Sequence, residues 1–366
     1  MEVQVEKNQL SKALGLVGNI ACSKPNSLPI LGNILLETVT PDQLRLVGTD
    51  LEVGISTQIS VKVSKEGSVT LPAKKLQEIV RELPEGEIDI SVAKNNAVNI
   101  KAGRGYFKIM GLAKDDFPKL PEKTAEQAIE IDQTLVKESL SLTSFAVSHD
   151  ETRYVLNGVL ISASGNKIRF VATDGRRLAY IEKEYLNKDG RDFEMIVPMK
   201  AIQELIKILS WDGVVRIIQT QNQAIFDVGN TYLVSRLIEG HFPNYEQVIP
   251  KGEKTTTETN REELLQAIRR TSLLASPESP AIKMDFVKGK ILLSSRSPNL
   301  GEAREELAAD VTGDEVAIGF NPNYLIDVLK NLDVDKVSLC LTDPDKPGLL
   351  RGKDGYLYVV MPMQIG

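Results

Sequence analysis

The spacing of hydrophobic residues alternates along the chain between the period of a helix and that of a strand. Apolar residues from Leu10 to Ile20 recur at helical spacing and predict a helix over residues 7–20. Segments in which apolar and polar residues alternate follow at 34–39 and 44–48, and these predict strands. The same order of a helix, strands, a second helix and further strands then returns twice, which indicates an internal repeat.

Short matching segments locate the repeats. Residues 170–174, FVATD, match residues 46–50, LVGTD, which lie 124 positions earlier. Phe117-Pro118 returns as Phe242-Pro243 in the second block. We therefore predict three similar domains, over residues 1–125, 126–250 and 251–366.

Each block contains a helix followed by strands two times. The fold class that we predict is α+β, with helices covering one side of antiparallel sheets. Short turns between the strands favour hairpins over parallel crossovers. Pro72 and Pro322 fall at first helical positions, and Asn260 is a suitable N-cap. The predicted helices span 7–20, 72–83, 132–146, 198–209, 260–274 and 322–332. The alternative is a single mixed α+β domain.

Composition changes this picture little. The chain has 366 residues, 42% hydrophobic and 26% charged, as is typical of soluble globular proteins. No apolar run approaches the roughly 20 residues of a membrane span, and the N-terminus has no signal-peptide core. Only two cysteines occur, Cys22 and Cys340, far apart in the chain. We therefore expect a cytoplasmic protein without membrane contact or a disulfide framework.

The sequence offers no convincing set of catalytic groups. Carboxylates are paired at adjacent positions, as in Glu262-Glu263 and Glu305-Glu306, and adjacent side chains point in different directions. Two histidines leave little for imidazole chemistry. The Gly103-Arg104-Gly105 segment indicates a hairpin turn, since it lacks the longer fingerprint of a nucleotide site. We therefore predict no catalytic residues, no metal and no cofactor.

Positive charge is concentrated on the predicted helices. They carry 12 lysines and arginines against 8 acidic residues, a balance of +4 in a chain whose net charge is −6. A shared helical surface would therefore be basic on an otherwise acidic protein. Such a surface suits contact with a phosphate backbone without reading of base sequence. Lysine-rich solvated helix faces are the simpler explanation.

Several motifs, in order along the whole chain, resemble those of the bacterial DNA polymerase III β subunits, the replicative sliding clamps. The segments that carry the resemblance are LPILGN at 28–33, GTDLE at 48–52, RYVLNG at 153–158, ATDG at 172–175, and YVVMPM at 358–363. The resemblance implies a non-catalytic processivity factor. In this family two chains form a head-to-tail homodimer, a ring that encircles duplex DNA with helices lining the interior. Its implied partners are the polymerase III α subunit, the clamp loader, other polymerases and repair proteins, which bind through short linear motifs.

The resemblance also implies two sets of site residues. The expected pocket for partner peptides comprises Leu156, Thr173, Gly175, Arg177, Leu178, Pro243, Val248, Asn321, Tyr324, Val359, Val360, Met361, Pro362 and Met363. The expected DNA contacts are Lys24, Lys74, Arg153, Tyr154 and Lys200. For Met361 and Met363 the alternative is a terminal strand that packs its own core. Arg176 stands where some clamps carry histidine, and the chain ends Gln364-Ile365-Gly366.

Two other classes of function stay open on the residues alone. One is a three-repeat scaffold that binds peptides but does not encircle DNA. The other is an enzyme with a cleft site, and the lack of converging histidine, cysteine or carboxylate groups argues against it.

Overall fold

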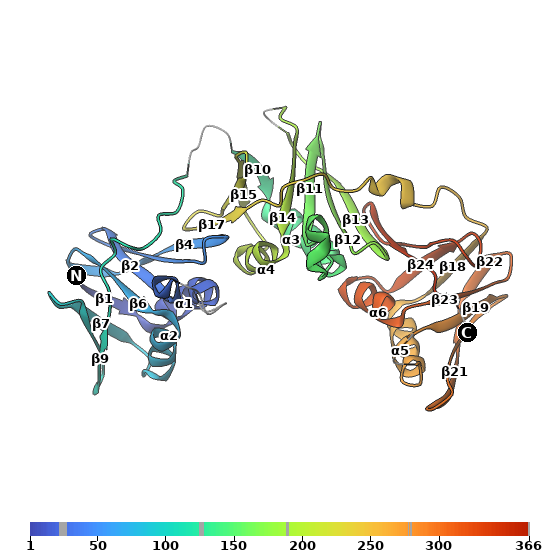
Figure 1. Ribbon diagram of the computed structural model, residues 1–366, viewed down its shortest axis with the longest axis horizontal. Helices are drawn as coiled ribbons and strands as arrows, with labels where there is room; N and C mark the ends of the chain where they lie inside the picture. Colours follow the sequence, from blue (N-terminus) through green and yellow to red (C-terminus); the bar gives the residue numbers. More distant parts are fainter. Residues whose placement is uncertain (22–27, 124–127, 188–189, 277, 279, 365–366) are drawn as a thin grey trace. The chain divides into compact units, whose positions relative to one another are not determined.

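A computed structural model describes residues 1–21, 28–123, 128–187, 190–276, 278 and 280–364 (Figure 1). All six predicted helices form. They are α1 (Lys7–Ala21), α2 (Ala73–Glu82), α3 (Gln133–Thr143), α4 (Met199–Ile208), α5 (Arg261–Ser272) and α6 (Pro322–Asn331). The strands pair antiparallel throughout the ladders of the described residues, as the short turns predicted.

Contacts between residues divide the chain into two compact units. The first comprises Met1–Thr134 and Lys200–Leu237, and the second Leu135–Met199 and Ile238–Gly366. The division cuts the middle repeat because its strands belong to two different sheets. Three sequence repeats have therefore become two units, each containing a sheet shared by two repeats.

The first unit contains two antiparallel sheets. A five-stranded sheet has the order β5 (Lys62–Lys65), β1 (Glu2–Glu6), β7 (Glu87–Val92), β8 (Ala97–Ala102) and β9 (Gly105–Met110). An eight-stranded sheet has the order β10 (Ile129–Asp132), β15 (Val214–Gln219), β16 (Gln223–Asp227), β17 (Thr231–Arg236), β4 (Val53–Ser60), β3 (Gln43–Thr49), β2 (Asn33–Thr40) and β6 (Ser68–Pro72). Pairing of β4 with β17 joins the first two repeats, and each strand removes the other's open edge.

The second unit repeats this plan. A nine-stranded sheet has the order β14 (Phe193–Pro198), β11 (Gly158–Ser164), β12 (Lys167–Thr173), β13 (Arg177–Glu184), β26 (Tyr356–Val360), β25 (Gly348–Arg351), β24 (Lys336–Leu341), β18 (Thr255–Asn260) and β22 (Asp310–Gly313). A four-stranded sheet has the order β21 (Gly301–Ala308), β20 (Lys290–Ser297), β19 (Ile282–Val287) and β23 (Val316–Phe320). Here β13 pairs with β26, which joins the second and third repeats.

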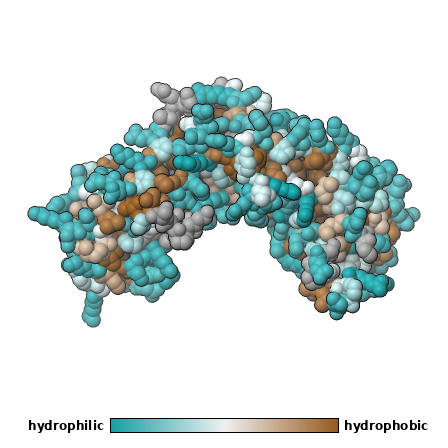
Figure 2. Space-filling view, in the orientation of Figure 1, coloured by the Kyte–Doolittle hydropathy of each residue, from teal (hydrophilic) through white to brown (hydrophobic). Residues whose placement is uncertain are grey.

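Helices cover the sheets through the faces that the sequence periodicity predicted. In α1, Leu10, Leu14, Val17 and Ile20 are all buried, and the helix packs on α2 and on β3 and β4. Burial of each such side chain contributes roughly 1.5–3 kcal/mol. In the second unit α5 packs on α6 and on β20 and β21. On the face drawn in Figure 2, hydrophobic residues lie in patches surrounded by hydrophilic ones.

Helix starts agree with the sequence in two cases and differ in one. The Asn260 side chain accepts a hydrogen bond from the Glu263 amide, and Pro322 is the first residue of α6. Pro72, predicted at the first helical position, instead ends β6 and occupies the N-cap of α2 with ψ 115°. Its lack of an amide hydrogen is harmless there also, since it precedes the first turn.

Three strands that precede the first helix of each repeat were missed from the sequence. They are β1, β10 and β18, and each alternates buried and exposed residues. Threonines in Thr255–Asn260 and the acidic residues in Glu2–Glu6 masked that period. No helix in the described part of the chain combines the length and apolar character that crossing a bilayer requires.

Candidate functional site

A rigid turn joins β12 to β13 in the second unit. The Asp174 Oδ1 accepts hydrogen bonds from the amides of Arg176 (2.9 Å) and Arg177 (3.0 Å). The Thr173 hydroxyl donates to the Arg177 carbonyl (2.6 Å) and accepts from the Gly175 amide (3.0 Å). Gly175 has φ +85°, a conformation that glycine adopts without strain. The turn therefore exposes Gly175 and Arg176 and directs Arg177 inward.

The Arg177 side chain is only 8% exposed, and each of its three nitrogens donates a hydrogen bond within the protein. It bonds to Asp174 Oδ2 (3.0 Å), Asp327 Oδ2 (2.6 Å) and the carbonyl of Phe145 (2.8 Å). Its charge also lies 4.7 Å from the ring centre of Tyr324. Burial alone would lower the pKa of Arg177, but Tyr358 and the Asp327 carboxylate outweigh it and raise that pKa. Arg177 therefore ties the turn to α6.

The C-terminal segment lies beside this turn. In the β13–β26 ladder Leu178 pairs with Val359, and Arg177 pairs with Val360. Beyond the strand, the Met361 amide donates to the Arg176 carbonyl (2.9 Å), and the Met363 amide donates to the Gly319 carbonyl (2.8 Å). The Met361 side chain is 40% exposed, so it is not part of a closed core.

Tyr358 attaches the same segment to a neighbouring helix. Its hydroxyl donates to the Tyr324 carbonyl (2.9 Å), which connects β26 to α6. Burial of the ring raises the pKa of the Tyr358 hydroxyl, so the group stays protonated and remains a hydrogen-bond donor. Arg177 thus contacts the ring of Tyr324, and Tyr358 bonds to its carbonyl.

An apolar cluster covers one face of the nine-stranded sheet. Its buried members are Leu160, Val171, Leu178, Ile196, Cys340, Leu349 and Val359. Half-buried Val155, Tyr180, Ile238, Phe242, Tyr245, Ile249 and Leu357 pack against them. Of these the expected pocket included only Leu178 and Val359. Val171, Tyr180 and Leu357 could have been found by continuing the strand alternation from the expected residues, because residues two apart lie on one face of a strand. Strand alternation does not find Val155, Ile238, Phe242, Tyr245 and Ile249, which lie outside the strands.

The structure places the other expected pocket residues in differing surroundings. Leu156 and Val360 are buried. Asn321 caps α6, where its side chain accepts from the Asn323 amide (3.0 Å). Pro243 and Val248 are exposed, and Pro362 is half-buried. Contacts thus connect Thr173, Gly175, Arg177, Leu178, Tyr324, Val359, Val360, Met361 and Met363 into one neighbourhood.

The expected DNA contacts differ in their exposure and in the interactions that they make within the protein. Lys74 is exposed on α2. Lys200 forms an ion pair with Asp50 inside the first unit. Arg153 and Tyr154 lie exposed in a 3-10 segment, Glu151–Leu156. Arg153 donates to the Asp174 carbonyl (3.3 Å), so it belongs to the same neighbourhood as the pocket turn. Lys24 lies outside the described residues.

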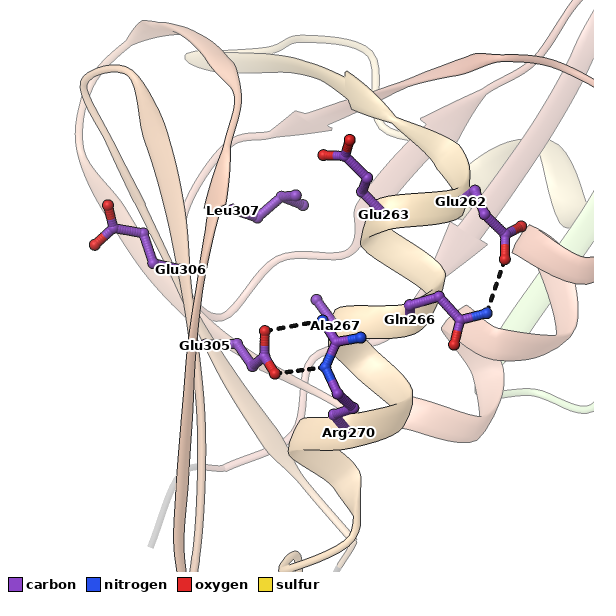
Figure 3. Close-up of a pocket in the computed structure, with 8 residues that line it drawn as sticks. All are labelled: Glu262, Glu263, Gln266, Ala267, Arg270, Glu305, Glu306 and Leu307. Atoms are coloured by element: carbon purple, nitrogen blue, oxygen red, sulfur yellow. Dashed lines mark hydrogen bonds and ion pairs between the residues drawn. The ribbon is translucent and has the colours of Figure 1, made fainter.

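The five-stranded sheet ends in the edge strand β9 and the four-stranded sheet ends in the edge strand β21, one in each unit. At the edge of the five-stranded sheet, β9 exposes Tyr106, Phe107 and Met110. At the edge of the four-stranded sheet, β21 is rich in glutamate. Between β21 and α5 lies a cavity of about 410 Å³ (Figure 3). Carboxylates from both elements line it, and Arg270 is held there by both oxygens of Glu305 at 2.6 and 3.0 Å.

Within the described residues no group of three or more histidine, cysteine, aspartate or glutamate side chains is placed to hold a metal ion. The groups that the site presents are an apolar sheet face, two partly accessible methionines and the backbone groups of the turn.

Comparison with known proteins identifies the family. Models of the N-terminal, central and C-terminal domains of the DNA polymerase III beta subunit match residues 1–121, 130–244 and 246–364. The beta sliding clamp of Pseudomonas putida is 35% identical over 370 residues, covering all of both chains. That of Chlamydia trachomatis is 32% identical over 365 residues, covering all of this chain and 87% of the relative. The chain belongs to the β sliding clamp family.

Solved clamps have the same fold over their full length. A sliding clamp of Pseudomonas aeruginosa bound to griselimycin superimposes with a TM-score of 0.94 at 34% identity, covering all of both chains. The clamp of Bacillus subtilis gives 0.94 at 30% identity with the same coverage. The three-domain α+β clamp fold that the sequence predicted is thus confirmed. A β sliding clamp is a processivity factor of DNA polymerase III and not a catalyst.

Proposed function

We propose that this clamp encircles duplex DNA as a head-to-tail homodimer and tethers the replicative polymerase to it. The polymerase III α subunit, the clamp loader, other polymerases and repair proteins would each insert a short apolar motif into one pocket. Because DNA is the proposed ligand, the bacterial cytoplasm is the proposed location. We also propose domain limits at residues 125 and 250.

One observation carries the pocket assignment: the backbone of the C-terminal segment is fixed while its methionines stay accessible. Hydrogen bonds hold the amides of Met361 and Met363, and the Met361 side chain remains 40% exposed. Methionine adapts its shape to different apolar partners. A fixed backbone with adaptable side chains suits one pocket that accepts several related peptides.

The contacts of Arg177 indicate a different role from the direct peptide contact that the resemblance implied. Its three nitrogens already donate hydrogen bonds within the protein, so we propose that it orients Tyr324 and the turn instead of binding a peptide carboxylate. The exposed Arg176 is the cation that a peptide could meet at the rim.

The open edges support a closed ring. We propose that β9 of one chain pairs with β21 of a second chain, because an unpaired edge readily adds another strand. Lys101, Arg104 and Lys108 accompany β9, and Glu302, Glu305 and Glu306 lie on β21, so the charges are complementary. A head-to-tail contact joins two chains into a ring when each contact turns one chain by half a rotation relative to the other, and we propose that this contact does so.

DNA contact would be electrostatic and independent of base sequence. The excess of lysine and arginine on the helices supports a basic inner surface, with Lys74 as its clearest exposed member. Because a ring holds DNA by topology, weak contacts that allow sliding are sufficient.

The test combines mass in solution with retention on circular DNA. A dimer has twice the 40.3 kDa of one chain. Loaded clamp should remain on a closed circle and leave once the circle is cut. Phe107→Asp at the β9 edge should give monomers that are not retained. Trp211→Asp is the matched control, since it changes an exposed aromatic residue that belongs to neither β9 nor β21. A stable native monomer would contradict the ring, and binding without release on cutting would favour the scaffold alternative.

A further inference from the structure

The turn of the candidate pocket has a near-exact counterpart in the first unit. The Asp50 Oδ1 accepts from the amides of Glu52 (3.0 Å) and Val53 (2.8 Å). The Thr49 hydroxyl donates to the Val53 carbonyl (2.9 Å) and accepts from the Leu51 amide (3.1 Å). Leu51 has φ +76°, where the second copy has Gly175 at +85°. The two turns are therefore equivalent at a spacing of 124 residues.

The apolar face beside the turn is also duplicated. Leu35, Val47 and Phe117 form a buried cluster on the eight-stranded sheet. Their counterparts at spacings of 124–125 residues are Leu160, Val171 and Phe242, which belong to the cluster beside the candidate pocket. The strand that follows the turn pairs in both cases with the last strand of the next repeat, β4 with β17 and β13 with β26.

The two copies differ where Leu178 forms part of the pocket. The equivalent residue in the first copy is Gly54, 124 positions earlier. A Cβ atom added to Gly54 would lie 2.4 Å from Cδ2 of Leu120, so the Leu120 side chain already fills that space. Leu120 follows Phe117-Pro118 in the segment that leaves the first repeat. Leu120 lies outside the sheet. It therefore supplies an apolar side chain at the position where β4 has only a glycine.

The corresponding segment of the second copy makes its ring contact at a different position of the strand. The counterpart of Leu120 is Tyr245, which follows Phe242-Pro243. Its ring contacts Tyr180, with ring centres 5.8 Å apart, and Phe242, with ring centres 6.4 Å apart. Tyr180 lies two residues further along β13, which corresponds to about 6.6 Å along a strand. The second segment thus makes an aromatic contact at Tyr180, whereas Leu120 in the first copy lies at the position equivalent to Leu178.

A cavity of about 470 Å³ remains beside Leu120 in the first unit. Leu35, Val47, Phe117, Leu120 and Tyr232 supply its apolar lining. Its charged rim is partly neutralised within the protein, because Glu37 pairs with both Arg45 and Lys114. Asp115, Lys119 and Glu122 complete its charged lining, and the apolar residues offer a surface for an apolar anchor.

We propose that this cavity is part of a second peptide groove, which the chain's own segment Phe117–Leu120 occupies. Leu120 takes the place of a partner's aliphatic anchor, and its withdrawal opens the groove to a short peptide of the same chemistry. The class of ligand rests on the proposed function of the second copy. The internal occupant explains why each chain would present one partner site although the fold contains the framework of two.

Two substitutions displace Leu120 in different ways. Leu120→Ala removes the occupant, and Gly54→Ala pushes the flexible end of Leu120 aside while keeping it in the chain. Gly15→Ala is the matched control, because an added Cβ there meets nothing within 4 Å. The probe is a short fluorescein-labelled peptide with leucine and phenylalanine anchors, and its stoichiometry is measured by calorimetry. Photo-crosslinking maps where it binds.

We expect the native chain and Gly15→Ala to bind one peptide per chain, and both displacing variants to bind two. The additional crosslinks should fall on residues 35–47. In chains truncated before Met361, the same variants should rise from no bound peptide to one. A stoichiometry that stays unchanged in both variants, with normal thermal unfolding, overturns the proposal. Failure of the native chain to bind any peptide would refute the pocket of the second copy. The two displacing variants would still test the groove of the first copy, since they either gain a peptide site or do not.

Discussion

Replacement of Arg177 by alanine tests whether the cross-tie that it makes holds the pocket in shape. The substitution removes bonds to Asp174, Asp327 and the Phe145 carbonyl, along with the contact to the Tyr324 ring. Breaking a buried ion pair by removing one partner typically costs about 3–5 kcal/mol. The low end applies here, because the Asp327 side chain is 38% exposed and can be rehydrated. We therefore expect a loss of about 3 kcal/mol.

Hydrogen exchange is the suitable assay because global unfolding of a chain with several domains is not a single transition. A loss of about 3 kcal/mol should speed exchange of the protected amides in β13 and α6 by about 100-fold, at roughly 1.4 kcal/mol per factor of ten. Amides of the first unit should not change. Peptide affinity should fall as well, because Tyr324 loses one of its two supports.

Arg351→Ala is the matched control. Its side chain is 51% exposed and pairs with Glu253 at 3.4 Å, an interaction worth about 0–1 kcal/mol. Arg177→Lys should fall between alanine and the native residue, since lysine keeps the charge but cannot reach all three acceptors. If Arg177→Ala changes exchange no more than Arg351→Ala does, the reasoning about this cross-tie is wrong.

Three further outcomes are expected. Truncation of Met361–Gly366 should abolish binding of polymerase-derived peptide while the mass in solution stays that of the native protein, and unchanged peptide affinity would disprove the pocket. Lys74→Ala should reduce the slope of log affinity for DNA against log salt by about 0.9, the contribution of one phosphate contact; an unchanged slope would remove Lys74 from the DNA surface. Hydrogen bonds from Lys114 and Arg45 outweigh burial and lower the pKa of Glu37 from its ordinary 4.5. A carboxylate with a lowered folded pKa stabilises the fold above the unfolded value and loses that contribution as pH falls through the folded one. Glu37→Gln should therefore flatten the fall, below pH 4.5, in the free energy of opening that hydrogen exchange gives for the amides of β2 and β3, and parallel curves for the two proteins would contradict this.

Local features were largely predictable because short-range physics determines them. Helical periodicity located α1 through α6, and the Thr-Asp-Gly segment is the turn that its residues favour. The strands β1, β10 and β18 escaped because polar residues obscured their alternation. Pro72 was placed one position too far into its helix, since a proline is acceptable at either position and sequence alone does not separate them.

The candidate site was only partly predictable. Motifs located the turn and the C-terminal strand, and periodicity within those segments could have added the apolar residues of the sheet face. The role of Arg177 could not be read from its position, because its partners Asp327 and Phe145 are distant in sequence. The exposed fraction of Met361 likewise depends on what packs against it.

By itself, the sequence determined three repeats, the α+β class and the duplicated turn, because helical and strand periods and turn chemistry act over a few residues. Tertiary structure alone decided that strands of neighbouring repeats merge into shared sheets, since unpaired strand edges are satisfied by whichever strand lies beside them. It also decided that Leu120 fills the space above Gly54. A glycine in a strand reports that room is available, but only the packed chain says which side chain fills it.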